Sequence, residues 1–133
     1  MAITDNSSLP LSLSIASASP HESQLVDTAI RERHTKDLPL RLIGDKAYDS
    51  DPLDARLAAS YRIWLIAPHK SNRRKKATQD GRALRRYKRR WKVERFFAWL
   101  FHFRRVETRY EVKAENFLGI VQLASTVILL RYL

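Results

Sequence analysis

Cysteine is absent from the 133 residues of this chain, and glycine occurs only three times. Without cysteine, the chain has no disulfide and no zinc-thiolate site. So few glycines leave no glycine-rich loop for a nucleotide and no nucleophile elbow. The opening residues, MAITDNSSLP, contain neither the basic nor the apolar region of a secretory signal. Secreted disulfide proteins and nucleotide-loop enzymes are therefore excluded.

Long apolar runs are also scarce. A long uncharged and mostly apolar run covers residues 116–130, which is shorter than a membrane span and includes Gln122, Ser125 and Thr126. This run predicts a buried terminal helix rather than a membrane anchor. Hydrophobic residues make up 44% of the chain, which is enough for the core of one domain. We therefore expect a soluble, cytoplasmic protein with no membrane partner.

Acidic residues are nearly missing from one segment, Lys70 to Arg95. Thirteen basic residues there accompany only Asp80 and Glu94. The resulting charge of +11 equals that of the whole chain, so the rest of the sequence is neutral. Such a block predicts a polyanionic ligand, usually a phosphate backbone, because each contact releases condensed counterions. The alternative is a solvated helix face or a self-repelling tail. Aromatic residues interleaved with the charge favour nucleic acid.

Apolar residues recur at helical spacing from Gly81 onward and predict one amphipathic helix of about 20 residues. The stripe consists of Leu84, Tyr87, Trp91, Ala98 and Phe101. Glu94 lies on the same stripe, which we expect to face the core or a cleft. Arg90 precedes Glu94 by four residues, so the two can form a surface salt bridge. Glu94 can also serve as a metal ligand beside a phosphate-binding surface. Spacing alone favours the salt bridge.

The amino-terminal third of the chain predicts a hairpin followed by a helix. A short strand at residues 2–4, turn residues at 5–8 and period-two alternation over 9–15 indicate the hairpin. Ser19 as N-cap and Pro20 at the first helical position predict a helix that ends near Arg33.

A strand–helix–strand unit comes next. The sequence predicts a buried strand over residues 40–44, a helix capped by Asp51, and a second strand over 62–67. This order implies a parallel crossover, in which functional groups gather at the carboxyl ends of the strands. Asp45 stands at such an end. A turn or N-cap role explains Asp45 equally well from spacing.

Five blocks of the sequence resemble bacterial insertion-sequence transposases of the DDE, RNase H-like class. The blocks are residues 42–50 (LIGDKAYDS), 87–95 (YKRRWKVER), 103–105, 108–111 and 116–119. Tyr87, Arg90 and Glu94 have the Tyr-x2-Arg-x3-Glu spacing of the signature helix of that family. The resemblance runs from about residue 3 to the end of the chain. It implies an α/β fold, an incomplete RNase H-like fold with a mixed sheet flanked by helices.

The resemblance also implies roles for individual residues. Asp45 is similar to the second catalytic aspartate of the family and Glu94 to the final acid, and both would bind Mg²⁺ or Mn²⁺ in a two-ion site. Tyr87 and Arg90 are similar to residues that contact the DNA of transposon ends. Four more basic residues would line the approach to that DNA: Arg73, Arg74, Lys75 and Lys76. The implied activity is metal-dependent phosphodiester cleavage and strand transfer in cut-and-paste transposition.

The implied partners are transposon-end and target DNA, so the expected location is the nucleoid.

Two departures from the family pattern qualify the resemblance. Phe101 stands where many relatives have a lysine, seven residues after the glutamate. The first catalytic aspartate of the family lies on a strand upstream of the hairpin, and Asp5, in a turn, is not assigned that role.

We therefore expect residues 1–133 to be a single domain. It would be the carboxyl-terminal portion of a transposase catalytic domain, without the first catalytic strand and the amino-terminal DNA-recognition region. A second-frame product and a decayed fragment both fit, and an upstream-frame half or a second copy is a candidate partner. Such a chain would be inactive alone. The alternatives are a non-enzymatic basic nucleic-acid-binding protein and a truncated inhibitor of transposition.

Overall fold

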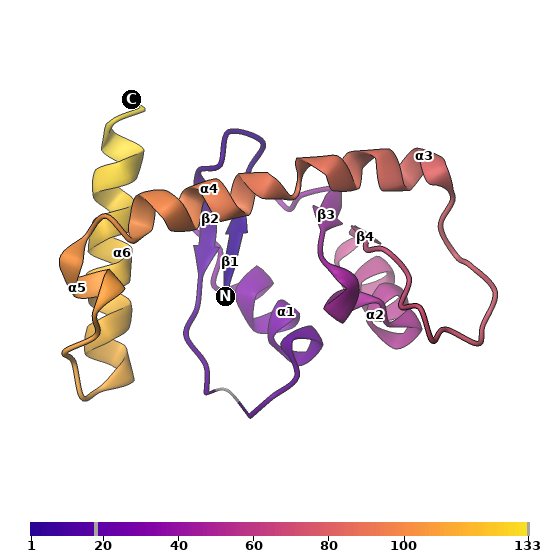
Figure 1. Ribbon diagram of the computed structural model, residues 1–133, viewed down its shortest axis with the longest axis horizontal. Coiled ribbons are helices and arrows are strands. Elements are labelled where there is room, and N and C mark those ends of the chain that lie inside the picture. The colour runs from indigo at the N-terminus through magenta and orange to yellow at the C-terminus, as the bar shows by residue number, and fades with distance from the viewer. Residues whose placement is uncertain (18, 133) are drawn as a thin grey trace.

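Two short sheets and one long helical segment organise the fold (Figure 1). The computed structural model describes residues 1–17 and 19–132. The antiparallel sheet consists of β1 (Ala2–Thr4) and β2 (Pro10–Leu13), and the parallel sheet of β3 (Arg41–Ile43) and β4 (Trp64–Ile66). The α/β class, the hairpin and the parallel crossover are confirmed. The expected mixed sheet is divided, because no ladder joins the two sheets within these residues.

Helices make up the rest of the regular structure. They are α1 (Glu22–Arg31), the 3₁₀ helix η1 (Lys46–Tyr48), α2 (Asp51–Tyr61), α3 (Gly81–Leu84), the 3₁₀ helix η2 (Arg85–Arg89), α4 (Trp91–Leu100), α5 (Arg104–Glu107) and α6 (Ala114–Leu130). The predicted basic helix corresponds to α3, η2 and α4, which follow one another along one side of the molecule and pass both sheets (Figure 1). The helical segment has the predicted extent of about 20 residues, but it consists of three consecutive elements rather than one continuous α-helix.

The amino-terminal caps of two helices differ from the sequence prediction by one or two residues. His21, not Ser19, is the N-cap of α1, because its Nδ1 accepts a hydrogen bond from the Ser23 N–H. Ser50, not Asp51, is the N-cap of α2. Asp51 is instead the first residue of that helix, and its carboxylate is available for a contact outside the helix.

Buried apolar side chains form two separate clusters. The hairpin core joins β2, α4, α5 and α6 through Leu13, Phe96, Leu100, Val106, Val121, Ala124 and Ile128. The crossover core joins α1, α2 and β4 through Val26, Ile30, Leu53, Leu57, Ile63 and Leu65. The predicted terminal helix is confirmed as α6, which packs against α4 and β2. Within the described residues, no helix is long and apolar enough to cross a membrane.

The orientation of the basic helix differs from the prediction. Phe96 and Leu100 are the buried residues of α4, whereas Trp91 and Phe101 of the predicted inward stripe are about half exposed. Apolar residues lie on several faces between positions 96 and 101, so spacing alone does not decide which face packs. As a result, Glu94 shares the exposed side of the helix, and the prediction that the stripe faces the core is wrong.

Candidate functional site

Asp45 lies just after β3, at the carboxyl end of this strand, as the sequence predicts. The Gly44 N–H donates to the Ile66 carbonyl at 3.0 Å, which continues the β3–β4 pairing by one residue. Asp45 then caps η1, and its Oδ1 accepts a hydrogen bond from the Ala47 N–H at 2.8 Å. Asp45 is thus a strand-end residue, and its predicted N-cap role is confirmed. Its catalytic role stays a prediction.

Gly44 and Tyr48 fix the turn around Asp45. A Cβ added at Gly44 would lie 2.8 Å from Cδ2 of the Tyr48 ring, so only glycine lets η1 fold this closely onto the strand. Burial raises the pKa of Tyr48 to about 12, with smaller contributions from the negative charges of Glu22 and Asp45. The ring of Tyr48 packs against the crossover core, which holds the turn in contact with it.

The signature residues of the basic helix form one connected row. The guanidinium carbon of Arg90 lies 5.8 Å from the centre of the Tyr87 ring, within cation–π range. The same guanidinium group contacts Glu94, with 2.5 Å between Nη2 and Oε1. The salt bridge that spacing favoured is confirmed. Arg90 and Glu94 are 38% and 55% exposed, so the pair contributes only about 0.3–0.5 kcal/mol to stability and remains accessible to a ligand.

The first residue of this row lies on an element that packs against β3, the strand that precedes Asp45. Tyr87 belongs to η2, and η2 packs against β3. Five basic residues along α3 and η2 are exposed: Arg82, Arg85, Arg86, Lys88 and Arg89. These side chains give α3 and η2 a basic, solvent-facing surface.

The two basic residues further along α4 have structural partners. Lys92 donates to the carbonyl and side-chain oxygens of Asn6. Arg95 donates to the Ser8 Oγ and lies 5.0 Å from the ring centres of Trp91 and Trp99. These contacts fasten the hairpin turn to the helix.

The carboxylates do not complete a metal site by themselves. Across residues 1–17 and 19–132, no group of three or more His, Asp or Glu side chains is placed to hold a metal ion. Asp45 and Glu94 supply hard oxygen ligands of the type that Mg²⁺ and Mn²⁺ prefer. The donor set therefore fits in chemical type but is too small for a complete site.

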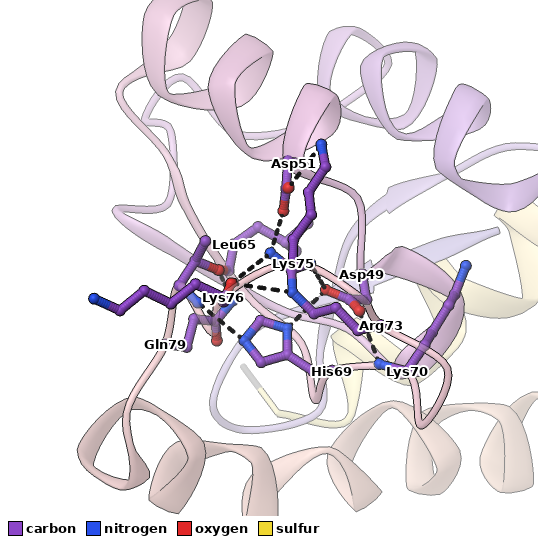
Figure 2. A network of polar contacts seen from close by, with 10 residues as sticks. Asp49, Asp51, Leu65, His69, Lys70, Arg73, Lys75, Lys76 and Gln79 are labelled. Carbon is purple, nitrogen blue, oxygen red and sulfur yellow. Dashed lines mark hydrogen bonds and ion pairs between the residues drawn. The ribbon is translucent and has the colours of Figure 1, made fainter.

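A network that the sequence did not reveal lies after β4 (Figure 2). Arg73 is only 12% exposed, and its guanidinium group is 3.1 Å from Asp49 Oδ1 and 2.6 Å from Asp51 Oδ1. Lys75 is 75% exposed, and its Nζ lies 3.5 Å from Asp51 Oδ2. Among the four predicted DNA-binding residues of this loop, Arg74 and Lys76 have exposed side chains and Arg73 is engaged with aspartates. No sequence pattern links these partners, which are more than 20 residues apart.

The three aspartates beside this loop have different pKa shifts. Burial alone would raise the pKa of Asp49, but the Lys70 N–H, His69 and Arg73 together hold it below its usual value. The Arg73 hydrogen bond lowers the pKa of Asp51. Burial, followed by the charges of Asp51 and Asp49, raises the pKa of Asp54 to about 6. Asp54 thus sits in a locally negative environment.

Asp54→Asn is expected to stabilise the chain at pH 7.5. Because the folded chain holds the Asp54 proton more tightly than the unfolded chain, ionised Asp54 opposes folding. The stabilising contribution of protonated Asp54 is complete below about pH 4 and is lost as the pH rises through about 6. The gain for Asp54→Asn should be about 1 kcal/mol at pH 7.5, reduced by solvent screening of a partly exposed group, and should vanish near pH 4. Urea unfolding across this pH range measures it.

The matched control is Asp51→Asn. The pKa of Asp51 is lowered, so its ionised form supports folding and the substitution should destabilise the chain at pH 7.5. A gain for Asp54→Asn that does not depend on pH would contradict the assignment.

A surface cleft of about 510 Å³ lies beside α2 and is lined by Asp51, Asp54, Trp64 and Gln79, among others. Neither Asp45 nor Glu94 lines it. The cleft is thus separate from the carboxylates that the sequence singled out.

Comparisons with known proteins point in one direction. Residues 1–127 match the protein family described as "Transposase DDE domain". The chain is 32% identical over 121 residues to the transposase assigned to insertion sequence element IS402 of Burkholderia cepacia, a match that covers 85% of this chain and 53% of that protein. It is 36% identical over 90 residues to the transposase assigned to insertion sequence element IS6501 of Brucella ovis, covering 68% of this chain and 67% of that protein. No solved structure gives a significant match.

Proposed function

The chain belongs to the DDE transposase family, and from this premise we propose that it forms the carboxyl-terminal portion of an RNase H-like catalytic domain that acts on insertion-sequence DNA. It spans about half the length of one curated relative and two thirds of the other. The observation that carries the proposal is the row formed by Tyr87, Arg90 and Glu94, which begins on the element packed against β3. This row combines a ring, a guanidinium group and a carboxylate on an exposed, strongly basic helix.

The complete enzyme would cleave a phosphodiester at the ends of an insertion sequence and join the freed 3′-hydroxyl to target DNA. DDE transposases generally use divalent metal ions. Asp45 and Glu94 would be two ligands of a Mg²⁺ or Mn²⁺ site, with further carboxylate from outside the described residues. Bound ions supply activation of the attacking oxygen and stabilisation of the leaving oxygen.

The protein side chains would bind and orient the DNA. The planar guanidinium group of Arg90 suits phosphate oxygens, and the Tyr87 ring can stack on an unpaired base. In the free chain, Arg90 holds Glu94 oriented by their salt bridge. Phosphate binding by Arg90 would release this carboxylate for a metal ion, which couples DNA binding to completion of the site.

The division of the sheet supports the view that part of the domain lies outside this chain. Ile3 of β1 and Leu42 of β3 both pack against the crossover core, although their strands are not paired with each other. The same helical segment contacts both strands, β1 through α4 and β3 through η2. Unpaired strand edges that face a shared core are sites where a further strand can add. The missing strand of the proposed domain would lie there.

The test compares Asp45→Asn and Glu94→Gln with Arg90→Ala. Both carboxylate variants are expected to lose Mn²⁺ binding in calorimetry and to keep their affinity for duplex DNA. Arg90→Ala should weaken DNA binding and lower the slope of log K against log salt by about 1, because one phosphate contact is lost. Fluorescence anisotropy across a salt series measures this. Unchanged Mn²⁺ binding in the carboxylate variants would refute the metal assignment.

A non-enzymatic, basic nucleic-acid-binding protein is the second candidate. It is favoured by the absence of a three-ligand group among the described residues, together with the exposed basic side chains of α3 and η2. It predicts the same salt dependence of DNA binding but no contribution of Asp45 or Glu94 to ion binding. A truncated inhibitor would instead be recognised by dominant inhibition of a full-length transposase without cleavage.

A further inference from the structure

The loop between β4 and α3 carries four basic residues in a row, yet it is held at several points (Figure 2). The centre of the arrangement is Asp49, whose side chain is only 5% exposed. Its carboxylate accepts hydrogen bonds from His69 Nδ1 at 2.8 Å, from the Lys70 N–H at 2.8 Å and from Arg73 Nη1 at 3.1 Å. One buried acid therefore receives three donors from the first half of the loop.

His69 connects this centre to the other end of the loop. Its Nε2 accepts a hydrogen bond from the Thr78 N–H at 3.2 Å, so Nε2 carries no proton in this arrangement. Nδ1 then carries the proton and donates a hydrogen bond to Asp49. A neutral His69 thus bridges Asp49 and Thr78.

Arg73 makes the second bridge. Besides Asp49 and Asp51, its guanidinium group donates to the Lys76 carbonyl from both Nε and Nη2, at 3.3 and 3.2 Å. The backbone from residue 73 to 76 is therefore closed by a side chain from within it. The side chains of Arg74, Lys75 and Lys76 remain exposed.

We propose that Asp49, His69 and Arg73 form a loop clasp that fixes Arg74, Lys75 and Lys76 as a phosphate-binding surface for DNA. The three clasp residues are positioning residues rather than DNA contacts. Holding the loop in one conformation before binding removes the entropy cost of ordering it on the DNA. This inference rests on the proposed DNA-binding function and assigns an acid, Asp49, the task of strengthening the binding of a polyanion.

Two neighbouring aspartates, Asp49 and Asp51, provide a test in which DNA affinity is expected to change in opposite directions. Asp49→Asn and Asp51→Asn each remove one negative charge, and by charge alone both would tighten DNA binding. Asp49→Asn removes the charged acceptor of the clasp, so we expect duplex DNA affinity to fall roughly tenfold and the salt slope to drop by about 2, the equivalent of two phosphate contacts. Asp51→Asn releases Lys75 from its partner, whereas its amide oxygen can still accept the hydrogen bond from Arg73 and the three donors to Asp49 are untouched. The DNA affinity of this variant should therefore equal or exceed that of the parent chain.

His69→Ala provides a variant with unchanged net charge. His69 is neutral in the clasp and belongs to neither apolar core, so its removal should leave the fold intact. We expect the same loss of affinity as for Asp49→Asn. Trypsin should cleave after Arg74, Lys75 and Lys76 several times faster in both variants than in the parent. Circular dichroism checks that both variants fold. If Asp49→Asn does not fold, the affinity of His69→Ala for DNA tests the clasp.

The outcomes separate this inference from the function on which it rests. If the parent chain does not bind duplex DNA, the proposed function fails, and the trypsin comparison still tests the clasp. If the parent binds DNA but Asp49→Asn and His69→Ala bind as tightly, the clasp has no role in binding and the inference is overturned. Equal weakening by Asp51→Asn would overturn the specific assignment to Asp49.

Discussion

Phe96→Ala is expected to lower the free energy of unfolding by about 3–5 kcal/mol, the range for deletion of a buried aromatic side chain. Phe96 is fully buried at the centre of the hairpin core, where α4 meets β2 and α6. Its loss removes apolar contacts and leaves a cavity. Domains of this size are stable by only about 5–15 kcal/mol, so a large part of the total would be lost. Urea unfolding followed by circular dichroism measures the change.

Phe101→Ala, five residues later, is the matched control. Phe101 is 51% exposed and contacts Phe97 in a stacked arrangement with 6.1 Å between ring centres. Its removal should cost about 1 kcal/mol or less. The same side chain is thus deleted from the two sides of one helix end. A similar loss in both variants would show that the helix does not pack as described.

A supercoiled plasmid incubated with this chain and Mg²⁺ or Mn²⁺ is expected to stay intact and unjoined. Rate enhancements by enzymes usually exceed 10⁶-fold and depend on a complete, preorganised site. The described residues provide no group of three metal-ligating side chains, and Glu94 is paired with Arg90. Two carboxylates alone should leave the phosphodiester uncleaved. Agarose gel electrophoresis separates nicked, linear and joined products from the starting plasmid.

The control for this experiment is the double variant with Asp45→Asn and Glu94→Gln. It differs from the parent chain at these two side chains alone, so any nicking in common with the parent chain comes from contaminating nuclease. Equal, low levels of nicking in both are the expected result. Strong metal-dependent nicking by the parent, abolished in the double variant, would show that the chain carries a complete active site.

Much of the local structure could be predicted from the sequence. The turn at residues 5–8 forms because Asp5 accepts hydrogen bonds from the N–H groups of Ser7 and Leu9, both within four residues. The parallel crossover followed from the order of apolar segments. The salt bridge between Arg90 and Glu94 depends on helical spacing alone. The turn and the salt bridge require only neighbours along the chain, and the crossover requires only the order of strand, helix and strand, so local patterns are enough to predict all three.

Features that depend on the choice among equivalent faces or partners could not be predicted in this way. The core-facing side of α4 is one such feature, since apolar residues occupy several of its faces. The loop clasp is another, because Asp49 and Arg73 are 24 residues apart and basic residues around Arg73 are equally plausible partners by type. The η1 and α5 helices were missed because each is a single turn that leaves no periodic signal.

By itself, the sequence determined where the charge lies, where the strands and the longer helices form, and the family to which the chain belongs. Charge is a sum over residues, and the other two properties follow from local sequence patterns. None of them requires knowledge of the packing. Only the tertiary structure decided that Glu94 faces outward and that Arg73 is engaged by Asp49 and Asp51. Burying Phe96 and Leu100 orients the whole helix at once, and ion pairs between distant segments form only after packing has brought them together.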